Sequence, residues 1–249
     1  MSEHVDVSRH GAVVQLALNR PEKKNALTGA MYERMIEAIR AADADEATAA
    51  IVFSGCPGTF TAGNDIGDFL QAAGGIERSP AFRFIKAIAS CATPLVAAVD
   101  GLAIGIGTTM LLHCDLAYAT PASVFRMPFV ELALVPEAAS SLLLPRRIGT
   151  VKAAEMLLLG EGIDAAEAHR LGLLNGVLPA SELLAQALAR AQNFAAMPRA
   201  ALAAARRLLR GDVAEVLARI DLEGSAFAAQ IASAEARGMF MKFMAKSKG

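Results

Sequence analysis

Strand, turn and helix signals follow one another in the stretch Pro94-Leu95-Val96-Ala97-Ala98-Val99-Asp100-Gly101-Leu102-Ala103-Ile104-Gly105-Ile106-Gly107. Leu95 to Val99 is a short apolar run that follows a proline, which is typical of a buried strand. Asp100-Gly101 predicts a turn, and the later glycines predict the start of a short helix from Gly105 to about Leu112. Glycines let the backbone approach a ligand closely, and a helix N-terminus presents free N–H groups.

This turn has three interpretations. A dinucleotide fingerprint fails, because its third glycine would fall on Met110. An oxyanion-binding turn suits the free N–H groups, whereas a tight turn without a ligand explains the glycines equally well. The loop Phe60-Thr61-Ala62-Gly63-Asn64-Asp65-Ile66 has the same form, because it follows an apolar strand and precedes a predicted helix. Two such loops can supply the two donors of an oxyanion hole, and the alternative for the second loop is an Asn-Asp helix cap.

Outward from these loops, strands alternate with helices, which predicts an α/β fold with substantial parallel pairing. Val5–Val7 and Val13–Leu18 predict a hairpin that turns at His10-Gly11. Further predicted strands are 49–54, 116–118 and 124–126. Predicted helices are 28–41, capped by Thr28, and 66–73, 79–91, 151–158, capped by Thr150, 165–171, 181–197, 199–209 and 212–237.

Composition excludes several classes of protein. The 249 residues carry 54% hydrophobic residues and a formal net charge of −1, which argues against disorder and against a basic surface for nucleic acid. No apolar run reaches the ~20 residues of a membrane span. Three cysteines at irregular spacing do not form a disulfide framework, and four scattered histidines do not form a metal site. With no visible leader or peroxisomal ending, we expect a cytoplasmic location.

Several motifs in order resemble the crotonase, or enoyl-CoA hydratase/isomerase, superfamily. They span nearly the whole chain: Asn19-Arg20-Pro21, Asn25-Ala26-Leu27, Phe60–Ile66, Pro94–Gly107, Cys114-Asp115-Leu116, Ala166-Glu167-Ala168 and Gly172-Leu173. The resemblance implies a crotonase-like spiral of ββα turns over residues 1–195 that holds the acyl-CoA site. It implies a C-terminal helical trimerisation region over 196–249, and a homotrimer or a dimer of trimers.

The resemblance also implies an acyl-CoA thioester substrate, with CoA entering as part of the substrate and no separate cofactor. It assigns the oxyanion donors to the backbone N–H groups of Asn64 and Ile106. Many relatives have glycine where Ile106 stands, a change that a backbone donor tolerates. Backbone from Ala62 through Gly63, Asn64 and Asp65 to Ile66 is expected to face the CoA moiety. Cationic or stacking contacts to CoA are expected from Lys23, Lys24, Phe243 and Lys246, with exposed surface as the alternative for the lysines.

The catalytic carboxylates of typical hydratases correspond by motif to Thr109 and Phe129, neither of which ionises. One carboxylate remains in Pro136-Glu137, in a segment that resembles the peroxisomal type of Δ3,Δ2-enoyl-CoA isomerase. There Glu137 is expected to be the acid/base, with its pKa raised by apolar neighbours Leu134, Val135 and Ala138. The alternatives are a purely structural role at a helix N-terminus and, as another carboxylate, Glu131. Asp65 is expected to cap its helix or tie the loop.

The sequence therefore predicts an enzyme that moves a 3-enoyl-CoA double bond to the conjugated 2-position through an enolate. The alternatives are an enoyl-CoA hydratase of unusual arrangement, a ring acyl-CoA isomerase and a non-catalytic acyl-CoA-binding protein. Acyl chain length and pathway, whether fatty-acid, aromatic or terpenoid degradation, stay open. No nucleic-acid or membrane partner is expected.

Overall fold

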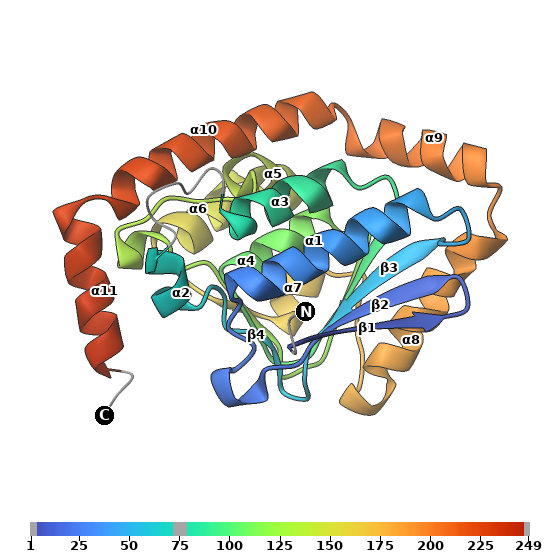
Figure 1. The fold of residues 1–249 in the computed structure, drawn as a ribbon, viewed down its shortest axis with the longest axis horizontal. Coiled ribbons are helices and arrows are strands. Elements are labelled where there is room, and N and C mark those ends of the chain that lie inside the picture. Colours follow the sequence, from blue (N-terminus) through green and yellow to red (C-terminus); the bar gives the residue numbers. More distant parts are fainter. Residues whose placement is uncertain (1–3, 72–78, 247–249) are drawn as a thin grey trace.

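Two sheets form the centre of the molecule in a computed structural model that describes residues 4–71 and 79–246 (Figure 1). The larger sheet has six strands in the order β1 (Val5–His10), β2 (Val13–Leu18), β3 (Ala50–Ser54), β5 (Leu95–Val99), β7 (Leu116–Ala119) and β10 (Gly176–Val177). The smaller sheet has four, in the order β4 (Thr59–Thr61), β6 (Leu102–Ile104), β8 (Val124–Arg126) and β9 (Ile163–Asp164).

From β3 to β8, consecutive strands alternate between the two sheets, which makes this part of the chain a spiral. β3, β5 and β7 pair in parallel in the larger sheet, and β4, β6 and β8 pair in parallel in the smaller one. Each turn of the spiral therefore contributes one strand to each sheet and then continues into helical structure, as the predicted ββα spiral requires. Only the pairs β1–β2 and β8–β9 are antiparallel among the described strands.

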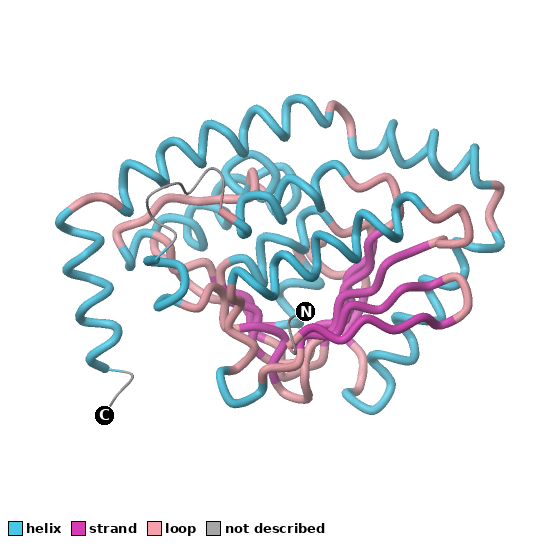
Figure 2. Tube along the Cα trace, viewed as in Figure 1, coloured by secondary structure: helices cyan, strands magenta, loops and turns pink. Residues whose placement is uncertain are grey.

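Helices cover both faces of the larger sheet (Figures 1 and 2). Ile51, Phe53 and Leu95 belong to the main core with apolar residues of α1 (Gly29–Ala44) and α3 (Pro80–Ser90). Val52 and Val96 form a second cluster with α8 (Ala180–Gln192). Since successive side chains of a strand point to opposite faces, these strands are apolar throughout, as a doubly covered parallel sheet demands.

The remaining helices surround the smaller sheet and then run along the upper edge in Figure 1. They are α2 (Ile66–Gln71), α4 (Ile106–Thr109), α5 (Ser140–Ile148), α6 (Thr150–Leu158), α7 (Ala165–Arg170), α9 (Arg199–Arg210), α10 (Val213–Ile231) and α11 (Ala234–Lys246). Short 3-10 helices occupy 21–23, 110–113, 130–132 and 193–196. Among the described residues, no helix combines the length and apolarity of a bilayer crossing.

Most predicted elements are confirmed, including the hairpin turn at His10-Gly11 and the Thr28 cap, whose side chain accepts the N–H of Met31. The Thr150 cap is wrong, because Thr150 is the first residue of α6 and Gly149 precedes it with φ 85°. The helix predicted over 212–237 is two helices, which break at Ala232-Ser233. Helix α8 ends at Gln192, before the predicted end. Residues 72 and 73 of the predicted 66–73 helix lie outside the described residues.

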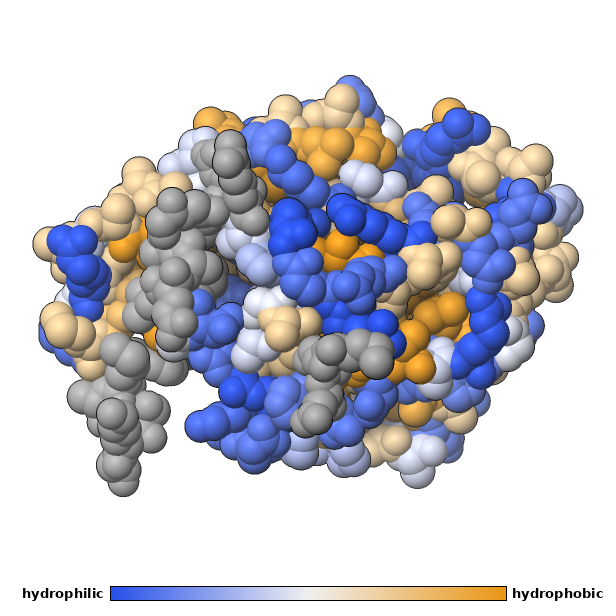
Figure 3. Space-filling view, viewed as in Figure 1, coloured by the Kyte–Doolittle hydropathy of each residue, from blue (hydrophilic) through white to orange (hydrophobic). Residues whose placement is uncertain are grey.

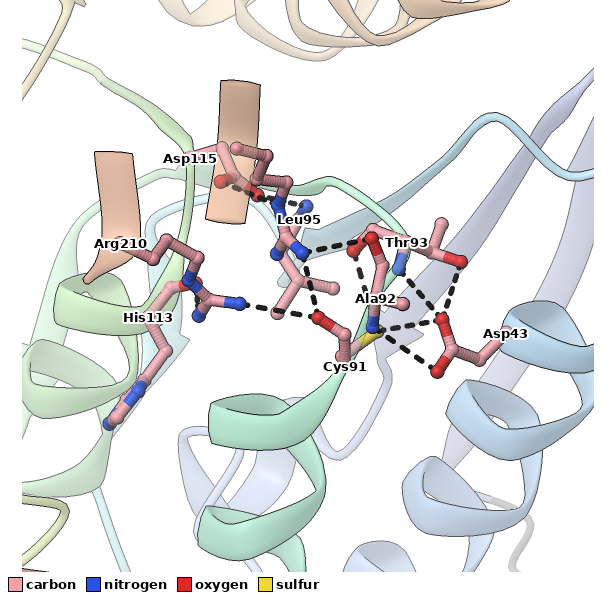
Figure 4. A network of polar contacts seen from close by, with 9 residues as sticks. Asp43, Cys91, Ala92, Thr93, Leu95, His113, Asp115 and Arg210 are labelled. Atoms are coloured by element: carbon pink, nitrogen blue, oxygen red, sulfur yellow. Dashed lines mark hydrogen bonds and ion pairs between the residues drawn. The ribbon is translucent and has the colours of Figure 1, made fainter. Parts of the chain in front are cut away.

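Two arginines of α9 attach the C-terminal region to the spiral (Figure 4). Arg206 Nε lies 2.8 Å from Asp115 Oδ1, and its Nη1 donates to the carbonyls of Cys91 and Ala92. Arg210 donates to the carbonyls of Cys91 and His113. These carbonyls follow α3 or precede β7, so α9 satisfies backbone groups that the spiral leaves unpaired.

Removal of the Arg206 guanidinium is expected to destabilise the fold strongly. Arg206 and Asp115 are only 9% and 12% exposed, so Arg206→Met leaves a nearly buried carboxylate without its cation. We expect urea denaturation to show a loss of roughly 3–5 kcal/mol in the free energy of unfolding. Arg170→Met, which breaks an exposed pair with Glu167, is the matched control and should cost less than about 1 kcal/mol. Equal losses in both variants would contradict this role of Arg206.

Candidate active site

Two neighbouring parallel strands of the smaller sheet end at the same edge, and each leads into a helix. β4 is followed by residues 62–65 and α2, and β6 is followed by Gly105 and α4. Because the carboxyl ends of parallel strands lie side by side, the backbone N–H groups at the two helix starts converge on one place. The sequence prediction of two donor loops thus corresponds to two adjacent strand ends.

Asn64 and Ile106 present their N–H groups at this edge. The bonds between Leu27 and this loop use the carbonyl of Gly63 and the N–H of Asp65, at 2.8 and 2.9 Å, so the N–H of Asn64 points away from Leu27. Within the described part of the chain it has no acceptor. Ile106 is the first residue of α4, where an N–H has no partner in its own helix.

The glycines of both loops are required by the backbone. Gly105 has φ 57° and ψ −118°, and Gly63 has φ 91°. L-residues rarely adopt such angles. A Cβ atom on Gly63 would also lie 3.0 Å from the carbonyl oxygen of Ile104, at the end of β6. Glycine at position 63 therefore lets the two strand ends lie in close contact.

Polar contacts hold the Asn64 loop in place. Arg20 Nη1 donates to Asp65 Oδ2 at 2.8 Å, and this ion pair contributes to the lowered pKa of Asp65. Asp65 Oδ1 also accepts the N–H of Asp68, which agrees with the expectation that Asp65 ties the loop. Tyr32 of α1 is buried and donates its hydroxyl to Asn64 Oδ1 at 2.6 Å.

An apolar cavity of about 120 Å³ lies against both Asn64 and Ile106. Phe129 and Leu134 form part of its wall, together with Phe227 of α10 and Phe240 of α11. The full lining consists of Ala62, Gly63, Asn64, Ile66, Ile104, Gly105, Ile106, Pro128, Phe129, Leu132, Leu134, Phe227 and Phe240. Side chains from both sides of the predicted division at residue 195 thus meet at this cavity, and the division itself stays a prediction.

Glu137 is a buried carboxyl group beside α4, only 4% exposed. Its Oε1 accepts the hydroxyl hydrogen of Thr109 at 2.5 Å. Thr109 lies one helical turn beyond Ile106, which relates the carboxyl group to the donor end of α4. Burial raises the pKa of Glu137 to about 8. The Thr109 hydrogen bond opposes this rise and the charge of Glu223 adds to it.

The chain turns sharply after Glu137. Ala138 and Ala139 have φ 58° and 55°, a left-handed conformation that costs about 1–2 kcal/mol per non-glycine residue. Glu137 itself does not line the described cavity, whereas Leu134, three residues earlier, does. The bond to Thr109 relates the carboxyl group to α4.

The structure describes some of the other predicted site residues in full and others only by their backbone. Lys24 is exposed, and its carbonyl accepts the N–H of Ala62, which places it beside the Asn64 loop. Phe243 and Lys246 lie in α11, and their side chains are outside the described ones. Glu131 forms a half-exposed ion pair with Arg126 on the surface, which does not favour it as the base.

Tyr32, Glu223 and His113 belong to the site but have no predicted role in the sequence. Tyr32 touches the donor loop, and both Glu223 and His113 bond to the backbone just after Glu137. In the sequence, Thr109 is notable only because it stands where typical hydratases have a catalytic carboxylate. No local pattern marks these residues, because each meets the site through a contact between distant segments.

No described cluster of three or more histidine, cysteine, aspartate or glutamate residues has the arrangement of a metal site. Burial raises the pKa values of Cys91 and Cys114 to about 12, as expected for inert core thiols.

The fold and the paired strand ends define a crotonase-type α/β spiral. Three comparisons agree with that class. Residues 8–248 match the sequence profile of the enoyl-CoA hydratase/isomerase family. The chain is 35% identical over 228 residues to enoyl-CoA delta isomerase 2 of Rattus norvegicus, covering 89% of this chain and 58% of the relative. It is 32% identical to a probable enoyl-CoA hydratase of Rhizobium meliloti, covering 97% and 95%.

A solved structure, of OdaA from Pseudomonas aeruginosa, superposes with a TM-score of 0.94 at 41% identity, covering 98% of this chain and 99% of that one. The chain belongs to the enoyl-CoA hydratase/isomerase family, and the predicted crotonase fold is confirmed. The chain spans 58% of the length of the rat isomerase, so the activity of that whole protein is not assigned to this chain by the comparison.

The raised pKa of Glu137 predicts a pH-dependent effect on stability. The fold retains a proton between pH 4.5 and about 8 that the unfolded chain has released, so the free energy of unfolding falls as pH rises through this interval. Glu137→Gln keeps the Thr109 contact and does not titrate. Its stability relative to the wild type should increase between about pH 5 and pH 8, by about 1.4 kcal/mol per pH unit at most. Parallel stability curves from urea denaturation would contradict the raised pKa.

Proposed function

We propose that the protein is an acyl-CoA isomerase that moves a double bond from the 3-position of an enoyl thioester to the conjugated 2-position. One observation carries the proposal: the buried carboxyl group of Glu137, with a raised pKa, is hydrogen-bonded to the helix whose first N–H is the proposed oxyanion donor. A 1,3-proton shift needs one base and a site for enolate charge, and both are present here.

In the proposed reaction, ionised Glu137 removes a proton from C2 of the thioester. The electrons move onto the thioester oxygen, which becomes an enolate, and the N–H groups of Asn64 and Ile106 stabilise that charge. Glu137 then returns a proton to C4, which leaves the double bond between C2 and C3. Each donor contributes about 2.7–4 kcal/mol to the transition state.

Hydration is the less favoured alternative. It requires a water activated by one group and a proton delivered to carbon by another, whereas Thr109 and Phe129 occupy the positions of the usual two carboxylates. In the structure Thr109 is engaged with Glu137, and Phe129 forms apolar wall. Names among the relatives include both delta isomerases and probable hydratases. A ring acyl-CoA isomerase and a non-catalytic binding protein stay as further alternatives.

CoA binding is proposed along the loop that carries Asn64. Ala62, Gly63, Asn64 and Ile66 line the cavity, whereas Asp65 does not. Exposed Lys24 lies beside this loop, where an ammonium group suits a CoA phosphate. Lys23, Phe243 and Lys246 complete the proposed contacts. CoA enters as part of the substrate, with no separate cofactor proposed.

The test is the turnover of 3-hexenoyl-CoA, followed by ultraviolet absorbance of the conjugated product. We expect turnover by the wild type and a loss of about 10²–10⁴-fold in kcat/KM for Glu137→Gln. Only the ionised carboxylate removes a proton, so kcat/KM should rise with pH to a plateau above the pKa of about 8. Thr109→Val, which removes a hydrogen bond that lowers this pKa, should move the midpoint to higher pH.

Crotonyl-CoA is the parallel substrate for hydration. Loss of its absorbance without conjugation of 3-hexenoyl-CoA would replace the isomerase with a hydratase. Full isomerase activity in Glu137→Gln would remove Glu137 from the mechanism. If neither substrate reacts, a binding assay with the CoA esters distinguishes a binding protein from an enzyme for another acyl group.

We also propose a homotrimer or a dimer of trimers. Apolar patches appear along the upper edge of the molecule, over the C-terminal helices (Figure 3). Leu208 and Leu209 of α9 are 85% and 86% exposed, and Leu222 of α10 is 64% exposed. Such residues are typical of an interface. Sedimentation equilibrium should give a mass of three or six chains of 26.0 kDa, and a monomer would contradict the proposal. The cytoplasmic location stays a prediction.

A further inference from the structure

The backbone after Glu137 is held by a side chain from the C-terminal region. Glu223 of α10 accepts the N–H of Ala139 at 2.6 Å with Oε2. Its Oε1 accepts the N–H of Ser141 at 3.0 Å and the Ser141 hydroxyl at 2.5 Å. Ala139, which precedes the first residue of α5, offers no side-chain cap of its own. Glu223 therefore takes the place of the missing cap, and its negative charge lies where a helix N-terminus favours it.

This contact acts on the strained part of the site. Two consecutive alanines in the left-handed conformation persist only where the surroundings fix them, and Glu223 bonds directly to the second one. Those two residues determine the direction in which the chain leaves Glu137. Loss of the Glu223 carboxylate would leave the N–H groups of Ala139 and Ser141 without their acceptor in a buried place.

We propose that Glu223 is a positioning residue for Glu137, through which the C-terminal helix fixes the geometry of the acid/base loop. The inference rests on the proposed function of Glu137. It assigns to α10 a role in the chemistry in addition to its place in the C-terminal helical region.

A second link between the same region and the same loop is indirect and runs through His113. Arg210 of α9 donates to the carbonyl of His113, and His113 Nε2 donates to the carbonyl of Ala138 at 2.8 Å. Burial lowers the pKa of His113 to about 4, so its ring is neutral at physiological pH. The loop is thus held at the N–H of Ala139 directly by α10, and at the carbonyl of Ala138 by His113 of the spiral, whose own carbonyl accepts from Arg210 of α9.

Close packing of α10 against α3 brings Glu223 to the backbone after Glu137. A Cβ atom on Gly224 would lie 2.5 Å from the ring of Phe82 on α3, so glycine at this position allows α10 to lie directly on α3. The rings of Phe82 on α3 and Phe227 on α10 also meet edge-on, with centroids 6.2 Å apart. The position of Glu223 is therefore fixed by the core and not by a flexible surface contact.

Glu223 also acts on Glu137 through its charge. Thr109 of α4, Tyr32 of α1 and neutral His113 face the Glu137 loop without a positive charge, and Glu223 is the described charged group that raises the pKa of Glu137. Arg219, one turn before Glu223, donates to Ser141 Oγ and partly compensates the Glu223 charge. Neutralising Glu223 should therefore lower the pKa of Glu137 while loosening its loop.

The test compares Glu223→Gln with Glu215→Gln. Glu215 lies on the same helix, two turns before Glu223, and also bonds to α5, through Arg146, but it is 48% exposed and makes no described bond to the Glu137 loop. In Glu223→Gln we expect kcat for 3-hexenoyl-CoA to fall roughly 10- to 100-fold with KM nearly unchanged. The midpoint of kcat/KM against pH should move to lower pH. Amide hydrogen exchange of a peptide spanning 137–142 should become faster, and Glu215→Gln should change none of these.

Each result decides the proposal. Unchanged exchange of the 137–142 amides in Glu223→Gln overturns it, and so does faster exchange with wild-type kcat in an active enzyme. If the wild type itself does not isomerise 3-hexenoyl-CoA, the proposed function fails. In that case ¹³C NMR measures the titration midpoint of Glu137 directly, and a shift to lower pH in Glu223→Gln still supports the positioning role. Should Glu223→Gln not fold, Ser141→Ala removes one donor to Glu223 and must give smaller changes in exchange and kcat, or the proposal is wrong.

Discussion

Desolvation of the Glu137 carboxyl group is the constraint on which the site depends. A carboxyl group in water ionises near pH 4.5 and is a weak base, whereas burial raises the pKa of Glu137 to about 8. Three features hold the buried carboxyl group in place: the hydrogen bond from Thr109, the two left-handed alanines after it, and the Glu223 carboxylate that bonds to their backbone. These features come from distant parts of the chain, and together they fix the Glu137 side chain in a desolvated position.

The spiral supplies the proposed oxyanion donors through backbone geometry alone. Because β4 and β6 are parallel neighbours, their ends place the N–H groups of Asn64 and Ile106 at one edge. Side-chain identity matters little for a backbone donor, which explains how isoleucine can stand at position 106. The side chains around the cavity instead control access and polarity, and Phe227 and Phe240 bring the C-terminal helices into that role.

Local signals predicted much of this fold. Apolar runs bounded by proline and glycine located β3, β5 and β7, and Thr28 marked the start of α1. The sequence does not predict β4 and β6, since three residues carry too little periodicity to mark a strand. The motif resemblance predicts Glu137 as the acid/base and Asn64 and Ile106 as donors, and these roles stay predictions. It could not reveal Glu223 or His113, whose contacts to the Glu137 loop join segments far apart in sequence and exist only once α9 and α10 have packed.

The central claim is that one carboxylate, and no second acid, performs the reaction. Proton NMR of the purified protein with 3-hexenoyl-CoA in D₂O tests it most directly, because it reports the double-bond position, the added groups and the deuterated carbons together. The account predicts vinylic signals that move to C2 and C3, deuterium confined to C2 and C4, and no 3-hydroxyacyl product. A 3-hydroxyacyl thioester as the main product, formed as fast as the bond moves, would contradict it.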